Sequence, residues 1–192
     1  YNRDAKNVTI EVLEDTIKKE SVEILITDNN EDYFGWGVDF KVQKKVNGEW
    51  KVAYCVQPDY LAPPDGTYNP DHGTEVEYDV AKGIYYSYGY PGWTKTTKPV
   101  VKEILSQYGD KDWDLSKSDD CYALCHILLS YYYDDVSTNS ADAFMGVDKD
   151  TRQIIRALAK QIKEDTEVFP DIPRTADACA VSFSADGKSG DG

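Results

Sequence analysis

The first third of the chain alternates hydrophobic and polar residues, which is the pattern of strands with one buried face. Residues 35–46 and 49–56 alternate most regularly, and the Asn47-Gly48 pair between them is a strong hairpin signal. Two shorter runs rich in β-branched residues precede them, at 7–15 and 21–27. The N-terminal part is therefore predicted to form a sheet built from these strands.

The turn of this hairpin decides which side chains share a face. A two-residue turn would pair Val46 with Glu49, whereas a three-residue loop would pair Lys45 with Glu49. The second register aligns the apolar faces of the two strands, so it is the one predicted. In this register Cys55 points away from the main core of the sheet. It is then exposed unless another element covers it.

The middle of the chain changes to the helical period. Residues 116–135 are apolar almost all round, which predicts a buried helix, and residues 148–165 carry an apolar stripe along one face. Before them, residues 58–73 contain four prolines and are predicted to form a loop. Helices are predicted at 78–90, 98–109, 116–135 and 148–165, and a last short strand at 178–183.

This order of elements predicts an α+β fold, an antiparallel β sandwich or barrel that carries a large helical insertion. The chain has 192 residues, enough for a single domain with a sizeable core. Within residues 1–192, we expect 1–60 and 176–185 to form the β part, 78–168 the helical insertion and 186–192 a flexible tail.

The charge of the chain narrows the choice of partners. Acidic residues outnumber basic ones by 35 to 21 and the net charge is −14, so nucleic acid is excluded as a partner for want of a basic face. No apolar run reaches the roughly eighteen residues that a membrane-spanning helix needs. The chain starts at Tyr1 without a signal peptide, and we expect it to be a mature or cut form.

The cysteines and acidic runs do not indicate a metal site. The four cysteines are too few for a disulfide scaffold at this length, and Cys121 and Cys125 are predicted to be core residues of one helix. No second cysteine pair or histidine pair accompanies them, as a zinc site would require. The acidic runs at 28–32 and 186–192 lack the ligand spacing of a calcium loop. No metal and no other cofactor is predicted.

Four segments give the chain a resemblance to a known family. They are AYCVQP around Cys55, the loop APPDGTY, the segment GIYYSYGYPGW and the helical stretch YALCHILLSYYYDD. In this order they resemble bacterial thioester domains, the adhesive heads of Gram-positive surface proteins and pilus tips. The resemblance extends from about Trp36 to Asp135, roughly half of the chain.

The resemblance implies a specific chemistry for Cys55. In the family, a cysteine thiol condenses with a glutamine side chain, expels ammonia and forms an internal thioester. A lysine amine of a host protein then attacks the carbonyl, which leaves an amide and frees the thiol. Because water would hydrolyse this bond, the helical block is expected to cover Cys55. His126, on the buried helix, is the candidate acceptor for the proton of the attacking amine.

The glutamine partner is not assigned by the resemblance. Gln57 lies two residues from Cys55 and on the same face, but this is not the arrangement of the family. The family's partner strand would fall near 178–183 or beyond Gly192. Two alternatives stay open, a partner that lies beyond this sequence and a domain that has lost the bond. None of the five glutamines fits the family's pattern: Gln43, Gln57, Gln107, Gln153 and Gln161.

The expected function is covalent adhesion. We expect an extracellular domain of a larger, cell-wall-anchored bacterial surface protein that binds a host surface or matrix protein, acts as a monomer, and reacts once instead of turning over as an enzyme. The chain has 15 tyrosines, and a tyrosine-rich face suits recognition because the ring is apolar while its hydroxyl stays hydrated. Tyr54, Tyr86 and Tyr122 are the candidate binding residues.

Other functions and other states of the thiol stay open at this point. A domain without the thioester would adhere non-covalently or serve as a structural surface domain. A cysteine hydrolase or transferase would use Cys55 as nucleophile and His126 as base. Cys55 would alternatively pair with Cys179 in a disulfide, or be an inert buried strand residue.

Overall fold

The computed structural model describes residues 8–12, 22–33, 36–46, 48–56, 66–68, 74–75, 77–108, 113–133, 144, 147–173 and 179–183. The strands are β1 (Val8–Val12), β2 (Val22–Tyr33), β3 (Trp36–Val46), β4 (Glu49–Cys55), β5 (Gly66–Tyr68), β6 (Thr74–Glu75) and β7 (Cys179–Phe183). The helices are α1 (Tyr78–Tyr85), the π-helical turn η3 (Trp93–Thr97), α2 (Lys98–Tyr108), α3 (Ser118–Tyr133) and α4 (Lys149–Glu164).

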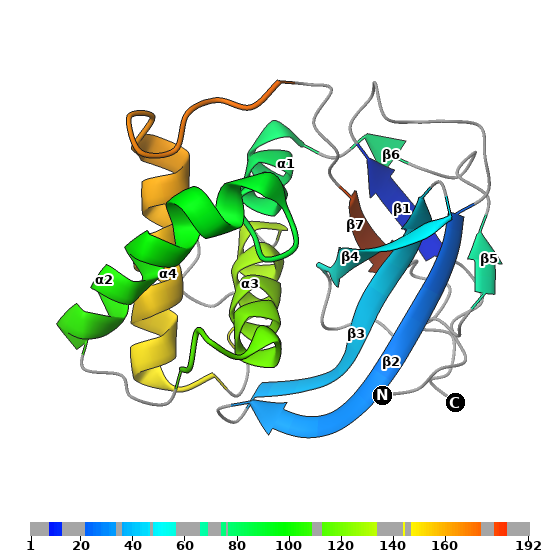
Figure 1. The fold of residues 1–192 in the computed structure, drawn as a ribbon, viewed down its shortest axis with the longest axis horizontal. Coiled ribbons are helices and arrows are strands. Elements are labelled where there is room, and N and C mark those ends of the chain that lie inside the picture. Colours follow the sequence, from blue (N-terminus) through cyan, green and yellow to red (C-terminus); the bar gives the residue numbers. More distant parts are fainter. Residues whose placement is uncertain are drawn as a thin grey trace, which may run out of the picture.

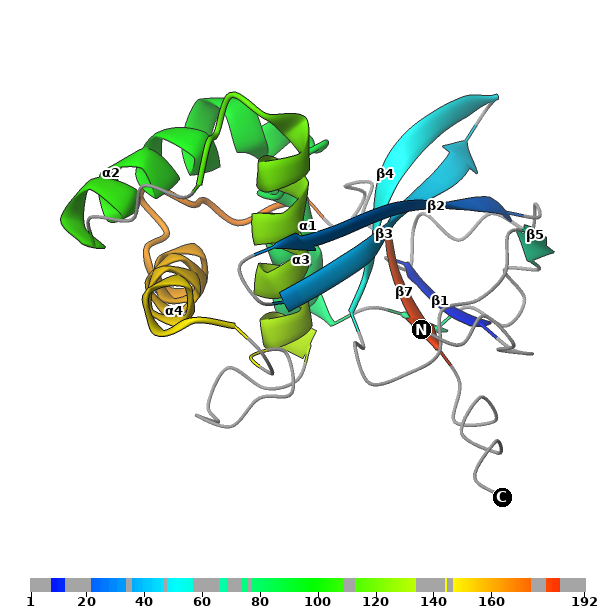
Figure 2. The same cartoon turned by 90° about the horizontal axis from the view of Figure 1, so that it is seen from below.

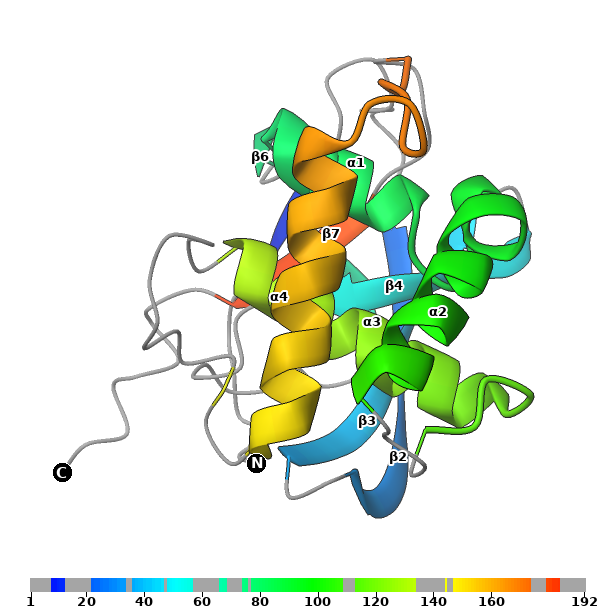
Figure 3. The ribbon, with the colours of Figure 1, turned by 90° about the vertical axis from the view of Figure 1, so that its left-hand side faces the viewer.

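The helices gather on one side of the molecule and the strands on the other (Figure 1). Along the chain, α1 to α4 follow one another between β6 and β7. In space, α1 and α3 lie next to the strands while α4 forms the outer side of the helical layer (Figure 2). Seen from the helical side, α4 runs in front of α3 (Figure 3). α3 therefore contacts both the sheet, at β4, and the outer helix α4.

The sheet brings the two ends of the sequence pattern together. Its strand order is β5-β2-β3-β4-β7-β1-β6. β4 pairs antiparallel with β3 along one edge and parallel with β7 along the other. β5 forms inside the proline-rich stretch predicted as a loop and pairs with β2. Two expectations stay predictions: that the fold is an antiparallel sandwich or barrel, and that the chain divides into a β part and a helical insertion. The strand order places β7, which comes late in the sequence, beside β4, the strand that ends at Cys55.

The register of the β3–β4 hairpin differs from the predicted one. The structure pairs Val46 with Glu49 and Lys45 with Trp50, so the turn has two residues. Gly48 has a φ of 81°, the left-handed backbone that a tight Asn-Gly turn needs. The Nζ atom of Lys45 lies 5.6 Å from the centroid of the Trp50 ring, a cation–π contact that favours this register. The predicted three-residue loop is wrong.

The register predicted by aligning the apolar faces of the two strands is wrong because the end of β4 is buried on both faces. Residues Ala53 to Val56 are all buried, so both faces of the strand are covered there. Alternation then no longer distinguishes one register from the other. The pairing with β3 ends at Ala53, opposite Val42, which leaves the last residues of β4 to other partners.

The helices have the patterns that the sequence indicates. α4 begins after Asp148, whose carboxylate accepts a hydrogen bond from the Thr151 backbone N–H at 2.9 Å. α3 is buried on all sides from Asp120 to Tyr132. No helix in the described ranges has both the length and the apolar character to cross a bilayer. The stripe of α4 is fully buried and consists of Ile154, Ile155, Leu158 and Ile162.

The segment between α1 and α2 docks onto β4. Gly89 has a φ of 91°, and a Cβ atom at this position would lie 2.7 Å from Cγ2 of Val52. Two hydrogen bonds flank this close approach. The hydroxyl of Tyr54 donates to the Tyr88 carbonyl, and the hydroxyl of Tyr90 donates to the Val52 carbonyl at 2.7 Å. The tyrosines and glycine of this turn thus attach the helical layer to the strand that carries Cys55.

Candidate functional site

Cys55 is the last residue of β4, and only 1% of its surface is exposed. Its sulfur is a thiol and is not part of a disulfide. The thiol is therefore buried, as expected. Its neighbours Tyr54 and Val56 are the side chains that join the core of the helical layer, so Cys55 points to the opposite face of the strand. The expectation that the helices cover this thiol stays a prediction. Exclusion of water is the condition that an acyl–thiol bond needs in order to persist.

Three polar side chains of α3 contact the backbone at the end of β4. The Tyr122 hydroxyl donates to the Ala53 carbonyl at 3.1 Å, and the Ser130 hydroxyl donates to the Cys55 carbonyl at 3.4 Å. Between them, the His126 side chain hydrogen-bonds the backbone of Cys55. Because the three residues are spaced four apart, they lie along one face of α3. We call these three side chains the α3 ladder.

The α3 ladder contacts β4 where its pairing with β3 ends, at Ala53, the last paired residue, and at Cys55 beyond it. β3 pairs with β4 only as far as Ala53, while β7 continues to Cys55 along the other edge. The carbonyls of residues 53 and 55 point to the same edge, because the backbone of a strand repeats every two residues. A buried carbonyl without a partner costs about 1–3 kcal/mol. The ladder therefore lets β4 end inside the protein.

His126 is held in its neutral form. Burial lowers its pKa from 6.5 to about 4, and the hydrogen bond to the Cys55 backbone only partly opposes this shift. At neutral pH the imidazole is uncharged and a weak proton acceptor. The structure thus brings His126 to Cys55, as predicted. Its role as a base stays a prediction, and the low pKa weighs against it.

Tyr54 and Tyr122 form an aromatic pair that joins β4 to α3. Their rings stack with centroids 5.0 Å apart, and they are 0% and 2% exposed. Burial, with Cys125 close by, raises the pKa of the Tyr54 hydroxyl, which therefore stays a neutral donor to the Tyr88 carbonyl. Neither side chain presents a surface to a macromolecule. In the structure, both tyrosines pack in the core and hydrogen-bond to the backbone, and they do not lie on an exposed binding face as predicted.

Tyr86 belongs to a different contact. Its hydroxyl donates to the Pro170 carbonyl at 2.8 Å, and its ring packs edge-on against Phe169 with centroids 5.0 Å apart. The side chain is buried, and these contacts are with the segment that follows α4. The structure therefore does not join Tyr86 to the group around Cys55.

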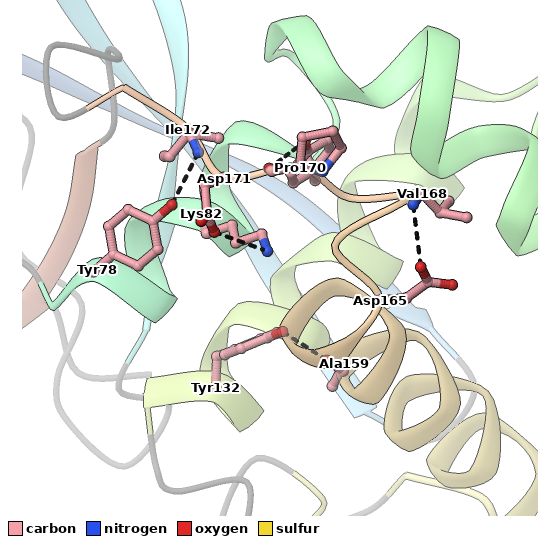
Figure 4. Close-up of polar contacts among 10 residues, drawn as sticks. Tyr78, Lys82, Tyr132, Ala159, Asp165, Val168, Pro170, Asp171 and Ile172 are labelled. Carbon is pink, nitrogen blue, oxygen red and sulfur yellow. Dashed lines mark hydrogen bonds and ion pairs between the residues drawn. The ribbon is translucent and has the colours of Figure 1, made fainter.

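The segment after α4 is also fixed to α1 by polar contacts (Figure 4). The Ile172 backbone N–H donates to the Tyr78 hydroxyl at 2.9 Å. The Nζ atom of Lys82, a buried residue, lies 3.7 Å from a carboxylate oxygen of the exposed Asp171. These contacts hold the segment after α4 against α1, and none of them involves Cys55.

The other thiols of α3 are core residues, as predicted. The Sγ atom of Cys125 accepts a hydrogen bond from the Tyr88 backbone N–H at 3.2 Å, and burial raises its pKa to about 12. Cys121 donates to the Leu115 carbonyl at 3.5 Å, and burial raises its pKa as well. Both stay protonated at neutral pH and are poor nucleophiles.

The alternative disulfide between Cys55 and Cys179 does not form. β4 and β7 run parallel, with Cys55 in register with Val181. Cys179 is two residues out of this register, so its Cα lies about 8 Å from that of Cys55, given a strand spacing near 4.8 Å and a rise near 3.3 Å per residue. A disulfide requires Cα atoms closer than about 7 Å.

No glutamine in the described part of the chain lies next to Cys55. Gln43 is on β3, opposite Val52 and hence three residues short of Cys55 along β4. Gln107 is on α2, and Gln153 and Gln161 are on α4, the outer helix. Gln57 falls outside the described residues. On β7 the residue in register with Cys55 is a valine, so the expected partner strand near 178–183 carries no glutamine at the adjacent position.

The contacts of Tyr122 and Ser130 with the β4 backbone were not predicted from the sequence. The spacing could have indicated them, since residues 122, 126 and 130 carry polar groups four positions apart within a largely apolar part of the helix. Within the described ranges, no three His, Cys, Asp or Glu side chains gather at a place where they could hold a metal ion. The candidate site therefore consists of a buried thiol at the end of β4, whose backbone is held by β7 on one side and by the α3 ladder on the other.

Comparison with known proteins supports one family. A family model described as a thioester domain matches residues 26–172. The match covers most of β2, the strands β3 to β6 and the helices α1 to α4, and it contains both Cys55 and the α3 ladder. Neither the curated proteins nor the solved structures give a significant match.

Proposed function

Because the chain belongs to the thioester-domain family, whose members are adhesin-type domains of surface proteins, we propose that it attaches a bacterial surface protein covalently to a host protein through Cys55. The partner group is an amine, and lysine side chains supply it on host surface or matrix proteins. The domain belongs to a Gram-positive cell surface and is anchored to the cell wall through another part of its protein.

The proposed reaction has two steps. First, the Cys55 thiol adds to the carboxamide carbon of a glutamine side chain, the C–N bond breaks, and the nitrogen leaves as ammonia with the thiol proton. Second, a lysine amine attacks the thioester carbonyl and the C–S bond breaks. The thiol of Cys55 regains a proton and the host protein is held by an amide. Each domain reacts once, so it is a reactant and not a turnover enzyme.

The observation that carries this proposal is the burial of the Cys55 thiol at the end of β4. A thiol on the end of a strand and only 1% exposed is protected in the way that a stored thioester requires. Gln57 and a glutamine beyond this sequence are the two candidate acyl partners, since the described glutamines lie elsewhere.

A second candidate function is non-covalent adhesion by a domain that has lost the bond. The specific observation in its favour is the valine at position 181, beside Cys55 on β7. The hydrolase alternative has less support, because His126 hydrogen-bonds the backbone of Cys55 and its pKa of about 4 makes it a weak base for a turnover reaction.

Intact-mass spectrometry of the natural protein and of this chain tests the proposal. With the thioester, the mass is expected to lie about 17 Da below the sequence mass, and methylamine is expected to add about 31 Da by opening the bond. Tandem spectrometry would place the methylamide on one glutamine and so identify the acyl partner.

Two cysteine variants serve as controls for this measurement. Cys55→Ala is expected to have its full sequence mass and to take up no methylamine. Cys125→Ala, which removes a thiol of similar burial from α3, is expected to keep both the mass deficit and its reversal. A full mass in the natural protein, unchanged by methylamine, would rule out the covalent mechanism and favour non-covalent adhesion.

A further inference from the structure

We propose that the α3 ladder of Tyr122, His126 and Ser130 positions Cys55 for acyl transfer, by holding the end of β4 at Ala53, where the pairing with β3 ends, and at Cys55. The three side chains act on the strand backbone and not on the reacting atoms, so they are positioning residues. This inference rests on the proposed function, because acyl transfer requires the thioester. The effect of the ladder on the accessibility of the Cys55 thiol can be tested without it.

The contacts of the ladder converge on two consecutive carbonyls of one strand edge. Tyr122 binds the Ala53 carbonyl, and Ser130 binds that of Cys55. His126 contributes a hydrogen bond to the Cys55 backbone from the turn of α3 between them. Each side chain is at most 4% exposed, so none of these hydrogen bonds is weakened by competition from bulk water.

The opposite edge of β4 is held by β7 up to the same residue. With Tyr54 paired to Ala180 and Cys55 to Val181, the backbone of Cys55 is fixed between a strand and a helix. A reacting sulfur must be held within about 0.5 Å of its productive position, and locked supporting residues achieve this. Burying polar groups at three successive turns of a helix is costly unless they are hydrogen-bonded, and here the β4 backbone supplies the hydrogen-bond partners.

The test reads the accessibility of Cys55 and does not need the thioester. The natural protein or this chain is first treated with methylamine so that any thioester is opened, and is then alkylated with iodoacetamide under native conditions. The rate at Cys55 is followed by peptide mass spectrometry. Tyr122→Phe keeps the ring and its stacking on Tyr54 but removes the hydroxyl. It is expected to raise the alkylation rate about fivefold, the factor by which loss of one typical hydrogen bond increases local opening.

Tyr132→Phe is the matched control. Tyr132 is a buried tyrosine of the same helix, and its hydroxyl donates to the Ala159 carbonyl of α4 at 2.7 Å, away from β4. This variant loses the same chemical group and a hydrogen bond of the same kind. Its alkylation rate at Cys55 is expected to stay within twofold of the unaltered protein, because the end of β4 keeps its partners.

His126 gives a rescue test. His126→Leu removes the polar contact and is expected to accelerate alkylation of Cys55, whereas His126→Gln, which retains a side-chain donor, is expected to restore most of the protection. Equal rates in Tyr122→Phe and Tyr132→Phe would overturn the proposal, because the ladder would then only add general stability. Equal rates in the two His126 variants would do the same.

The two proposals fail in different ways. A natural protein with full mass but with the expected alkylation pattern would refute the thioester and leave the ladder as the device that shields Cys55. A natural protein with the mass deficit, but with no difference between Tyr122→Phe and Tyr132→Phe, would refute the ladder and leave the thioester.

Discussion

Lowering the pH from 6.5 to 4 is expected to reduce the free energy of unfolding by about 3 kcal/mol through His126 alone, given its folded pKa of about 4 against 6.5 for the ordinary side chain. The cause is burial beneath β4, which penalises the charged imidazole. In this interval the unfolded chain binds a proton on residue 126 that the folded protein does not bind. Stability therefore falls as the pH falls, by about 1.4 kcal/mol for each unit, and levels off below about pH 4.

Urea unfolding of the protein and of His126→Gln at pH 7, 6, 5 and 4 would measure this effect. Carboxylates titrate in the same range, but they are common to both proteins, so the difference between the two curves isolates His126. The variant is expected to lose about 3 kcal/mol less than the unaltered protein between pH 7 and pH 4. Parallel pH profiles would show that the imidazole is hydrated or charged in the folded state, contrary to its burial.

Elements whose pattern is repeated over several turns could be predicted from the sequence. The stripe of α4 at Ile154, Ile155, Leu158 and Ile162 is fully buried, as its spacing indicates. α3 is buried all round because it lies between β4 and α4, and its composition indicated this. Each of these predictions relied on a period that packing against one or two neighbours preserves.

Features that depend on pairing between distant segments could not be read in the same way. The hairpin register was wrong because Ala53 to Val56 are buried on both faces, so face matching gave no information there. The placement of Tyr86 against Pro170 joins two segments 84 residues apart, and nothing local to either segment indicates it.

In the candidate site, one feature could be predicted from the sequence and another could not. Cys55 and His126 were predicted to meet, and they do, because Cys55 ends β4 and His126 lies on the helix that packs against this strand. The prediction used chemistry, a thiol and a base, and so it assigned His126 to the sulfur. The structure directs His126 to the backbone, since the edge of β4 beyond Ala53 lacks the strand partner that would otherwise satisfy it.

The turn at Gly89 links this site to the helical layer, and its replacement is expected to have the other large effect. Gly89→Ala should lower the free energy of unfolding by about 2–5 kcal/mol, from the strain of a positive φ and from overpacking against Val52. A Cβ at this position would lie 2.7 Å from Val52 Cγ2, with φ at 91°. Relief of this clash would move the turn away from β4 and weaken the hydrogen bonds of Tyr54 to Tyr88 and of Tyr90 to Val52.

Gly48→Ala is the matched comparison, because Gly48 has a similar φ of 81° but no heavy atom within 4 Å of the place where a Cβ would be. It should lose only the backbone term, about 1 kcal/mol. The difference between the two variants in urea unfolding, about 1–3 kcal/mol, therefore measures the close packing of the turn on β4. If both variants lost the same free energy of unfolding, the turn at Gly89 would have moved to accommodate the added methyl group without loss of stability. The contact between the tyrosine-rich turn and β4 would then be loose, and α3 would have to hold the end of this strand without help from the turn.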